Sequence, residues 1–204
     1  SDAFMKIESN QANAWLGQVV AGAGDVNGDG YDDLIVGAWS YDNGVTQEES
    51  VFVFLGRPTA PSGWLTPNDA WAKFRCNQAG AKLGVALAGL GDINGDGRAE
   101  IAMTASDYNN GQISEGAVFI ISGLNVQPAG WEDPAASSYT WAKFESNLMG
   151  AFLGASVGAA GDVNGDGYAD VIVSALNYDD PGQEDEEKGA AFVFPGSASQ
   201  PSGT

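Results

Sequence analysis

The sequence contains no histidine, one cysteine and few basic residues, and each shortage excludes a class of function. Without histidine the chain lacks the commonest general base and the commonest ligand of transition metals. A single cysteine, Cys76, cannot form an internal disulfide. Eight basic residues against 27 acidic ones give a net charge of −19, which repels nucleic acid and attracts cations. We therefore expect no nucleic-acid partner.

Long apolar runs are also missing. No stretch approaches the roughly 20 residues that a membrane-spanning helix needs, so we expect no membrane insertion. No signal peptide is visible, as expected of a chain that begins after processing or within a longer protein. The chain is nevertheless 44% hydrophobic and 10% aromatic over 204 residues, which is enough to bury a core.

Repetition is what the sequence has in abundance. One nine-residue phrase occurs three times, at 25–33, 92–100 and 162–170, with starts 67 and 70 residues apart. A Leu-Gly pair precedes each copy and an apolar run follows it. Such periodicity is typical of solenoids, propellers and tandem arrays. We expect residues 1–204 to form one region, with repeat units at about 4–63, 71–130 and 141–203.

Each copy of the phrase places side-chain oxygens at positions 1, 3, 5 and 9, and glycine at positions 4 and 6. Calcium takes about six to eight oxygen ligands in flexible geometry. We therefore predict three structural Ca²⁺ sites, each using four side chains and the backbone carbonyl of position 7. The predicted ligands are Asp25, Asn27, Asp29, Tyr31 and Asp33; Asp92, Asn94, Asp96, Arg98 and Glu100; and Asp162, Asn164, Asp166, Tyr168 and Asp170.

Other interpretations of the phrase fit less well. Asn-Gly and Asp-Gly pairs mark hairpin turns, but turns alone do not explain three acids at fixed offsets in three copies. An EF-hand loop begins in the same way and needs an acid at position 12, where this chain has Val36, Met103 and Val173. Magnesium prefers fewer protein ligands and retains water. Calcium is therefore the cofactor that the sequence predicts.

The segments between the phrases predict four short strands per unit. The first strand is rich in small residues (18–23, 85–90, 155–160), whereas the second (34–38, 101–105, 171–175) and third (51–55, 117–121, 191–194) are nearly all apolar. Apolar runs bounded by glycine suit strands that are buried on both faces. The fourth strand, as at 71–75, alternates and suits a half-exposed outer edge. A slim first strand fits the crowded centre of a radial array, which favours propeller blades.

The two ends of the chain break this pattern. Residues 4–8 look like a fourth strand with no blade before it, and the third unit stops after its third strand. Two arrangements account for this. Either copies of the chain join as a homo-oligomer, so that two chains give six blades, or the chain is a segment of a longer propeller.

These motifs resemble the FG-GAP repeat, the blade of the integrin alpha-subunit β-propeller and its bacterial relatives. The FG element corresponds to Leu16-Gly17, Leu83-Gly84 and Leu153-Gly154, and the GAP element to 37–39, 104–106 and 174–176. The resemblance implies an all-β fold of three four-stranded FG-GAP propeller blades, each with a calcium loop between its first and second strands. It also implies an extracellular or cell-surface, secreted module for adhesion or protein–protein interaction.

A carbohydrate-binding or accessory module of a secreted enzyme is the alternative function, so the ligand is a protein or a glycan. Trp39 in the GAP position is the better binding candidate, whereas Trp71 and Trp141 occupy a repeat position typical of packing. The acidic loop 179–189 is expected to be a solvated loop, with docking of a basic partner or of another cation as its alternative role. Cys76 aligns with Ser9 and Ser146 and is expected to be structural.

Catalysis is not expected of this chain. Paired carboxylates can hydrolyse glycosides, but the well-placed acid clusters are already accounted for as metal ligands. No serine or cysteine has a histidine to act as its base. We therefore assign no catalytic residue and expect that the chain is not an enzyme.

Overall fold

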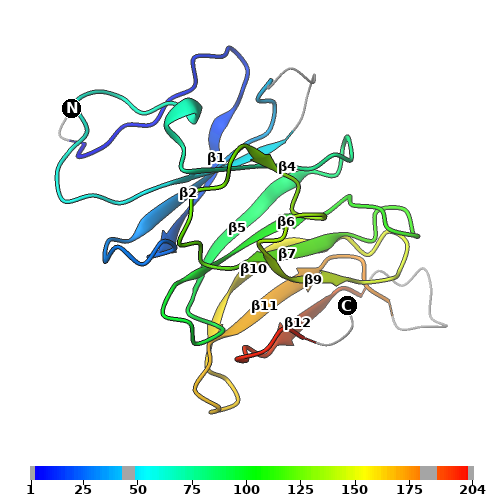
Figure 1. Cartoon of the computed structure of the whole chain (residues 1–204). Coiled ribbons are helices and arrows are strands. Elements are labelled where there is room, and N and C mark those ends of the chain that lie inside the picture. The colour runs from blue at the N-terminus through cyan, green and yellow to red at the C-terminus, as the bar shows by residue number, and fades with distance from the viewer. Residues whose placement is uncertain (1–2, 43–48, 180–187, 202–204) are drawn as a thin grey trace.

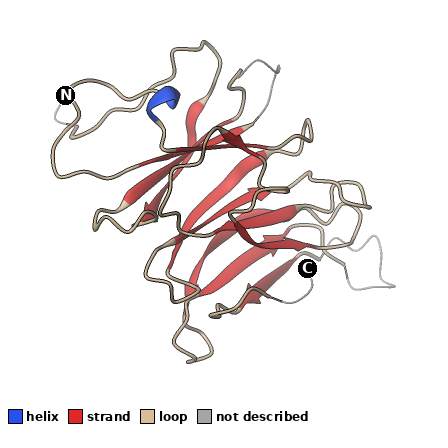
Figure 2. Ribbon diagram, viewed as in Figure 1, coloured by secondary structure: helices blue, strands red, loops and turns tan. Residues whose placement is uncertain are grey.

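The computed structural model describes residues 3–42, 49–179 and 188–201, in which the chain is all-β and folds as three sheets side by side (Figure 1). Strands account for nearly all of the regular structure, with a single 3-10 turn, η1 (Pro67–Asp69), among these residues (Figure 2). The strands are β1 (Leu16–Gly24), β2 (Asp33–Ala38), β3 (Ser50–Phe54), β4 (Ala72–Arg75), β5 (Leu83–Gly91), β6 (Glu100–Ala105), β7 (Ala117–Ile121), β8 (Trp131–Glu132), β9 (Thr140–Glu145), β10 (Leu153–Gly161), β11 (Asp170–Ala175) and β12 (Ala190–Phe194).

Apart from β8, the strands of each sheet follow the chain and pair antiparallel in the predicted order. The first sheet runs β1-β2-β3-β4-β8, the second β5-β6-β7-β9 and the third β10-β11-β12. The register repeats as well, since Leu34 faces Phe54, Ile101 faces Ile121 and Val171 faces Phe194. We call the three sheets blades 1, 2 and 3. The predicted first, second and third strands are confirmed in all three.

The inner strands of neighbouring blades approach each other closely, because β1 contacts β5 and β5 contacts β10. A Cβ atom on Gly89 of β5 would lie 2.4 Å from the carbonyl oxygen of Gly22 in β1. No side chain fits at that distance, which explains why this position of β5 is glycine. The predicted crowding at the first strands is therefore present.

We predict that Gly89→Ala lowers the free energy of unfolding by about 1–3 kcal/mol, because the added methyl group must push two backbones apart. Gly63→Ala is the matched control, since nothing lies within 4 Å of its Cβ position. Chemical denaturation of both variants measures the difference. An equal stability for the two would show that the approach of β1 and β5 is looser than described.

Apolar side chains fill the spaces between the blades. Ile35, Val53 and Phe74 of blade 1 pack against Met103 and Phe119 of blade 2, and all five are fully buried. A second cluster joins blades 2 and 3 in the same way, and includes Val118, Ile120, Leu153, Val171 and Val173. The core is therefore built from contacts between sheets, and each blade depends on its neighbours for burial. Cys76 lies in the first cluster, 4% exposed, as expected of a structural residue.

Three features differ from the predicted strands. β8 is a fifth strand that pairs in parallel with β4, and the sequence did not predict it. Residues 4–8 form an extended segment joined by a single bridge between Ile7 and Leu65, not a strand. β12 is only partly buried, which contradicts the prediction that every third strand is buried on both faces. Its exposure has a physical cause, because no blade covers its outer face among the described residues.

Candidate metal-binding loops

The three predicted metal loops join the first and second strands of each blade and lie along one edge of the molecule (Figure 1). They contact one another in chain order. The Arg98 side chain of the second loop lies 3.5 Å from the Cβ position of Gly28 in the first. The Tyr168 ring of the third lies 3.0 Å from the Cβ position of Gly95 in the second. In the second and third loops, the side chain at position 7 thus contacts position 4 of the preceding loop.

The acid at position 1 organises each loop from within. Asp25 accepts hydrogen bonds from the amides of Gly28 (2.7 Å), Asp29 (3.0 Å) and Gly30 (2.8 Å). The second and third loops repeat this pattern through Asp92 and Asp162. In the third loop these amide bonds, led by that of Gly167, lower the pKa of Asp162. The loop backbone is therefore shaped around an ionised carboxylate.

The tight wrap of each loop needs glycine at positions 4 and 6. Gly28 and Gly30 have φ angles of 78° and 90°, in the left-handed region, and the corresponding glycines of the other loops agree. These angles direct successive amide groups toward the Asp25 carboxylate. The phrase is thus a loop with an inward-facing acid, not a simple two-residue hairpin turn.

Positions 3 and 5 bring further oxygens to the same loop. Asn27 accepts the amide of Asp29 at 3.0 Å and donates its Nδ2 to the Asp29 carboxylate at 2.9 Å. Asp29 also accepts the amide of Tyr31 at 3.0 Å. Asn164 and Asp166 repeat these contacts in the third loop.

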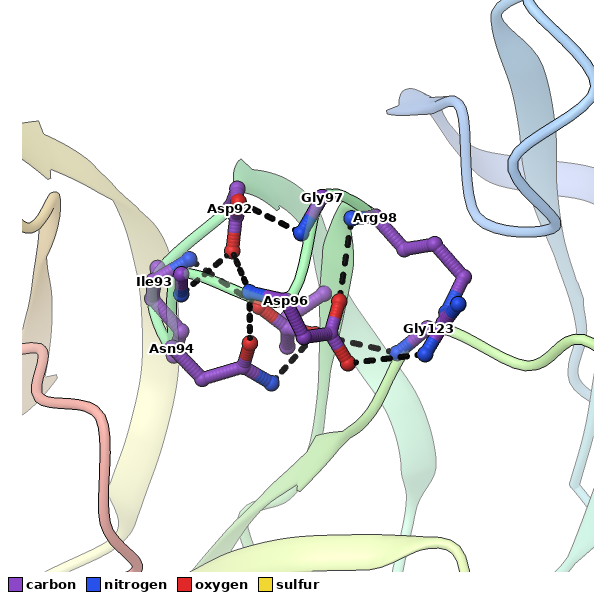
Figure 3. Close-up of polar contacts among 9 residues, drawn as sticks. Asp92, Ile93, Asn94, Asp96, Gly97, Arg98 and Gly123 are labelled. Atoms are coloured by element: carbon purple, nitrogen blue, oxygen red, sulfur yellow. Dashed lines mark hydrogen bonds and ion pairs between the residues drawn. The ribbon is translucent and has the colours of Figure 1, made fainter.

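The second loop differs from the other two at position 5. The Arg98 guanidinium donates a hydrogen bond to the Asp96 carboxylate at 3.1 Å, and Asn94 Nδ2 donates one to the Glu100 carboxylate at 3.0 Å (Figure 3). The first and third loops have tyrosine where this loop has arginine. A cation of the protein therefore already neutralises one predicted ligand of the second loop.

The acid at position 9 has a role that the sequence did not reveal. Asp33 is 0% exposed, and it accepts the amides of Val26 (2.9 Å) and Gly56 (2.7 Å). Glu100 accepts the amides of Ile93 and Gly123, and Asp170 those of Val163 and Gly196, at 2.9–3.0 Å. This acid therefore fastens the start of the loop to the chain that leaves the third strand. One sequence signal could have pointed to this contact, because a glycine recurs two residues after each third strand and its amide is the donor.

Burial raises the pKa of two of these acids. Desolvation raises the pKa of Asp33 to about 6, against the lowering effect of its two amide bonds, and Asp29 and Asp25 add repulsion. The pKa of Glu100 rises to about 7 for the same reasons, with Asp96 and Asp92 as its acidic neighbours. The first two loops thus bring acids close enough to repel one another, and a bound cation would compensate their charge.

The donor set fits a hard cation in chemical type. Each loop offers carboxylate, amide and backbone oxygens and no nitrogen or sulfur ligand. A carboxylate has about four acceptor positions, so the three amide bonds to Asp25 leave capacity for an ion. In the part of the chain that the structure describes, no three acidic, histidine or cysteine side chains gather as metal ligands do. Positions 1, 3 and 5 share one loop interior, whereas position 9 faces the amides behind it. The whole predicted ligand set, the position 7 carbonyls included, stays a prediction.

The loops are also where neighbouring blades are joined by backbone hydrogen bonds. The carbonyl oxygen of Asp25 accepts the amide of Ala99 at 2.9 Å, and that of Val26 accepts the amide of Leu124 at 2.7 Å. Ile93 of the second loop accepts the amide of Ser197 of blade 3 at 3.0 Å. The order of each loop is therefore coupled to the position of the next blade.

The opposite edge of the blades carries a second candidate surface. There the residue before the first strand of a blade lies beside the residue after its second strand. Backbone hydrogen bonds hold the two segments together, as where the Ser40 amide donates to the Ala14 carbonyl oxygen at 3.3 Å. In blade 1 this juxtaposes Trp15, 65% exposed, with Trp39, 39% exposed. We call Trp15 and Trp39 the tryptophan pair. Trp39 is the binding candidate that the sequence singled out, whereas Trp15 was not singled out, and both stay candidates.

One backbone feature marks this edge in every blade. Trp15, Lys82 and Phe152 occupy the same repeat position and have φ angles of 53°, 61° and 51°. Left-handed angles are uncommon for residues other than glycine, and they cluster at functional sites. Blade 3 also places Phe152 beside Leu176, which is 62% exposed, whereas blade 2 places Lys82 beside Ser106. The side chains at this edge thus vary while the backbone does not.

Other predicted features are placed as follows. Trp141 is 9% exposed and Trp71 packs against the core, which confirms that their repeat position is one of packing. The acidic run Glu184–Glu187 lies outside the described residues, as do most of the loop 42–50 and Gly203. No helix in the described part of the chain is both long and apolar enough to cross a membrane.

Comparison with known proteins agrees with this architecture. The FG-GAP repeat family matches residues 16–54, 83–121 and 153–194, more than half of the chain. Each match runs from the first strand of a blade through the candidate metal-binding loop to the third strand. The chain therefore belongs to the FG-GAP repeat family.

Similar proteins include integrin alpha chains. Integrin alpha-5 of Xenopus laevis is 32% identical over 177 residues, which cover 83% of this chain and 15% of the integrin. Integrin alpha-IIb of Mus musculus is 34% identical over 175 residues, 83% of this chain and 16% of the integrin. A phosphatidylinositol-glycan-specific phospholipase D of Rattus norvegicus is 31% identical over 166 residues, 79% of this chain and 18% of the enzyme. The chain thus spans about a sixth of the length of the relatives it matches.

Proposed function

We propose that this chain is a calcium-stabilised β-propeller module that recognises a protein partner outside the cell. The observation that carries the proposal is the position of the three loops. Each holds the same set of oxygen donors, and the carbonyls of the first two accept amides from the next blade. An ion held by a loop would therefore stabilise both the loop and the contact between two blades.

Calcium would be held by the oxygens at positions 1, 3 and 5, with positions 7 and 9 completing the set. The negative charge of the loops supports this assignment, because the neighbouring acids of the same loop add repulsion to the desolvation that raises the pKa of Asp33 and Glu100. The second loop should bind most weakly, since Arg98 already pairs with Asp96 at 3.1 Å. Calcium supplies only charge compensation and cross-linking here, and no reaction is assigned to it.

Recognition is assigned to the edge opposite the metal loops. The tryptophan pair exposes two large rings on a backbone fixed by hydrogen bonds, and rigid aromatic anchors of this kind dominate protein interfaces. Similarity to integrin alpha chains supports a role in adhesion or protein interaction at the cell surface. The net charge of −19 favours a partner with a basic surface.

The expected result is that Trp15→Ala combined with Trp39→Ala weakens partner binding at least about tenfold and leaves the melting temperature within about 2 °C, since exposed rings contribute little to folding. The assay is binding of the labelled chain to a panel of purified extracellular-matrix proteins and to a glycan array, in calcium. Trp64→Ala is the matched control, because Trp64 is 63% exposed on another part of blade 1.

Two outcomes would overturn this assignment. Binding to glycans alone would favour the carbohydrate-binding alternative, since tryptophan rings also stack on sugars. Binding that Trp64→Ala weakens as much as the double variant would move the recognition site away from the opposite edge.

A further inference from the structure

Asn-Gly pairs recur along this chain, and in the described residues they lie at 27–28, 94–95, 110–111 and 164–165. A further pair, 43–44, lies outside the described residues. Asparagine loses its side-chain amide most readily before glycine, because glycine has no side chain to keep its backbone nitrogen away from the preceding carboxamide. Three of the described pairs lie in the candidate metal-binding loops, and the pair 110–111 does not.

In the candidate metal-binding loops, the glycine of each pair is held by a hydrogen bond. The Gly28 amide donates to the Asp25 carboxylate at 2.7 Å, and the corresponding amides of the other two loops donate to the acid of position 1 at 2.6 Å. Each bond directs the N–H group toward that acid. The glycine nitrogen is therefore not free to attack the asparagine before it.

The asparagine of each of these pairs is held as well, at both ends of its carboxamide. Asn27 accepts the amide of Asp29 at 3.0 Å and donates its Nδ2 to the Asp29 carboxylate at 2.9 Å. The asparagines of the second and third loops also use both ends, at 2.8–3.0 Å. Three hydrogen bonds must therefore break before the carboxamide and the glycine nitrogen of one pair can meet.

Asn110 and Gly111 are held much less. Both are exposed, in the loop that joins β6 to β7 at the edge opposite the metal loops. Asn110 donates its Nδ2 to the Glu145 carboxylate at 2.9 Å, but no described residue hydrogen-bonds to its Oδ1 or to the Gly111 amide. Nothing lies within 4 Å of the Cβ position of Gly111, which leaves room for a ring to form there. One hydrogen bond, in place of three, restrains this pair.

We propose that Asn110 is a site of spontaneous deamidation, which the fold leaves open at this pair and closes at the three loop pairs. The Gly111 nitrogen attacks Cγ of Asn110 and forms a C–N bond. The bond from Cγ to Nδ2 breaks, and Nδ2 leaves as ammonia with the proton of the Gly111 amide. Water then opens the succinimide ring at either of its carbonyls, and the product is aspartate or isoaspartate at position 110.

The product places a negative charge where the carboxamide donated a hydrogen bond. Its neighbours are two acids that are shielded from water, since Glu115 is 0% exposed and the Glu145 side chain 8%. Glu145 accepts the Asn110 side chain, and Glu115 accepts its backbone amide. Lys143 pairs with Glu145 at 2.8 Å and offsets part of the charge. Deamidation thus exchanges a donor for a third carboxylate, and the three repel one another.

The same loop joins blade 2 to blade 3. The carbonyl oxygens of residues 113–115 accept the amides of Gly150, Phe152 and Leu153 at 2.8, 3.2 and 3.1 Å. Repulsion at position 110 pushes on the segment that carries these acceptors. Deamidation of Asn110 therefore loosens the contact between blades 2 and 3 at the edge to which we assign recognition.

Peptide mapping by mass spectrometry tests the site. After incubation of the folded chain in calcium at mildly alkaline pH, the peptide with Asn110 should gain about 1 Da at least about tenfold faster than those with Asn27, Asn94 and Asn164, because each of these must break two further hydrogen bonds. In urea the four peptides should react at similar rates, since the fold that distinguishes them is gone. Equal rates in the folded chain, or a slower reaction at Asn110, would overturn the proposal.

Asn110→Asp tests the consequence, because it carries the charge of the product. Amide hydrogen exchange at Gly150, Phe152 and Leu153 should accelerate at least about fivefold over the wild type. Gln112→Glu is the matched control, since it adds the same charge to the same loop and its side chain makes no hydrogen bond among the described residues. It should leave the exchange of these amides unchanged. Equal exchange in Asn110→Asp and the wild type would contradict the loosening of the contact between the blades.

Discussion

Removal of calcium is expected to lower the melting temperature of this protein by at least about 15 °C. A ligand at 100 times its dissociation constant stabilises a folded chain by about 2.7 kcal/mol per site. Three sites would together contribute about 8 kcal/mol, and about 1 kcal/mol moves the melting temperature of a chain of this size by about 2–4 °C. Calorimetry in millimolar calcium and in excess EGTA measures the shift.

A variant without loop acids serves as the control for this experiment. Asp29, Asp96 and Asp166 hold position 5 in the three loops and are exposed, so their joint replacement by alanine should not disrupt the core. We expect the triple variant to melt at the same low temperature with and without calcium. Identical melting curves for the wild type in calcium and in EGTA would contradict a structural role for the ion.

The second large effect is expected at position 9, and it should not depend on calcium. Asp33→Ala leaves the amides of Val26 and Gly56 without their acceptor in a buried site. An unsatisfied buried group costs about 1–3 kcal/mol, so we expect a loss of about 2–5 kcal/mol in the free energy of unfolding. Urea denaturation in EGTA measures this loss without any contribution from the ion.

Asp29→Ala is the matched comparison, because it removes an acid of the same loop that has no buried partner outside it. In EGTA it should change the stability by less than about 1 kcal/mol, and in calcium it should weaken the stabilising effect of the ion. If Asp33→Ala were neutral in EGTA, the two amide bonds would not hold the loop to the third strand, and Asp33 would act only as a metal ligand.

Much of the fold could be predicted from the sequence, because the repeat reveals local structure three times over. Runs such as Val51–Leu55 and 117–121 are apolar without interruption, and this pattern is typical of strands buried between two sheets. The small residues at 85–90 indicate crowding, which the 2.4 Å approach at Gly89 bears out. The glycines and the acids at positions 1, 3 and 5 shape each loop through contacts that stay within the nine residues of the phrase.

Features that depend on neighbouring blades could not be predicted in the same way. β12 has the composition of a buried strand, but its exposure depends on whether another sheet covers it. β8 is two residues long and pairs with β4, which lies nearly 60 residues earlier in the chain. Neither fact is contained in a local pattern, since both depend on where distant segments meet.

In the candidate site too, contacts between residues close in the sequence could be predicted, whereas contacts between distant residues could not. Asp25 acts on amides three to five residues away, and the spacing of the phrase reveals it. Asp33 acts on Gly56, 23 residues away, so its second role becomes visible only when β2 and β3 are paired. Trp15 becomes a neighbour of Trp39 for the same reason, and its left-handed φ has no sequence signal in a residue other than glycine.

Amide hydrogen exchange tests most directly whether the loops, with their ions, join one blade to the next. The informative amides are those of Ala99, Leu124 and Ser197, which donate to the carbonyls of the preceding loop. In EGTA we expect their exchange to accelerate by at least about tenfold more than that of the β6 and β7 amides within blade 2. Equal acceleration at all of these amides, or none at Ala99 and Leu124, would contradict the account.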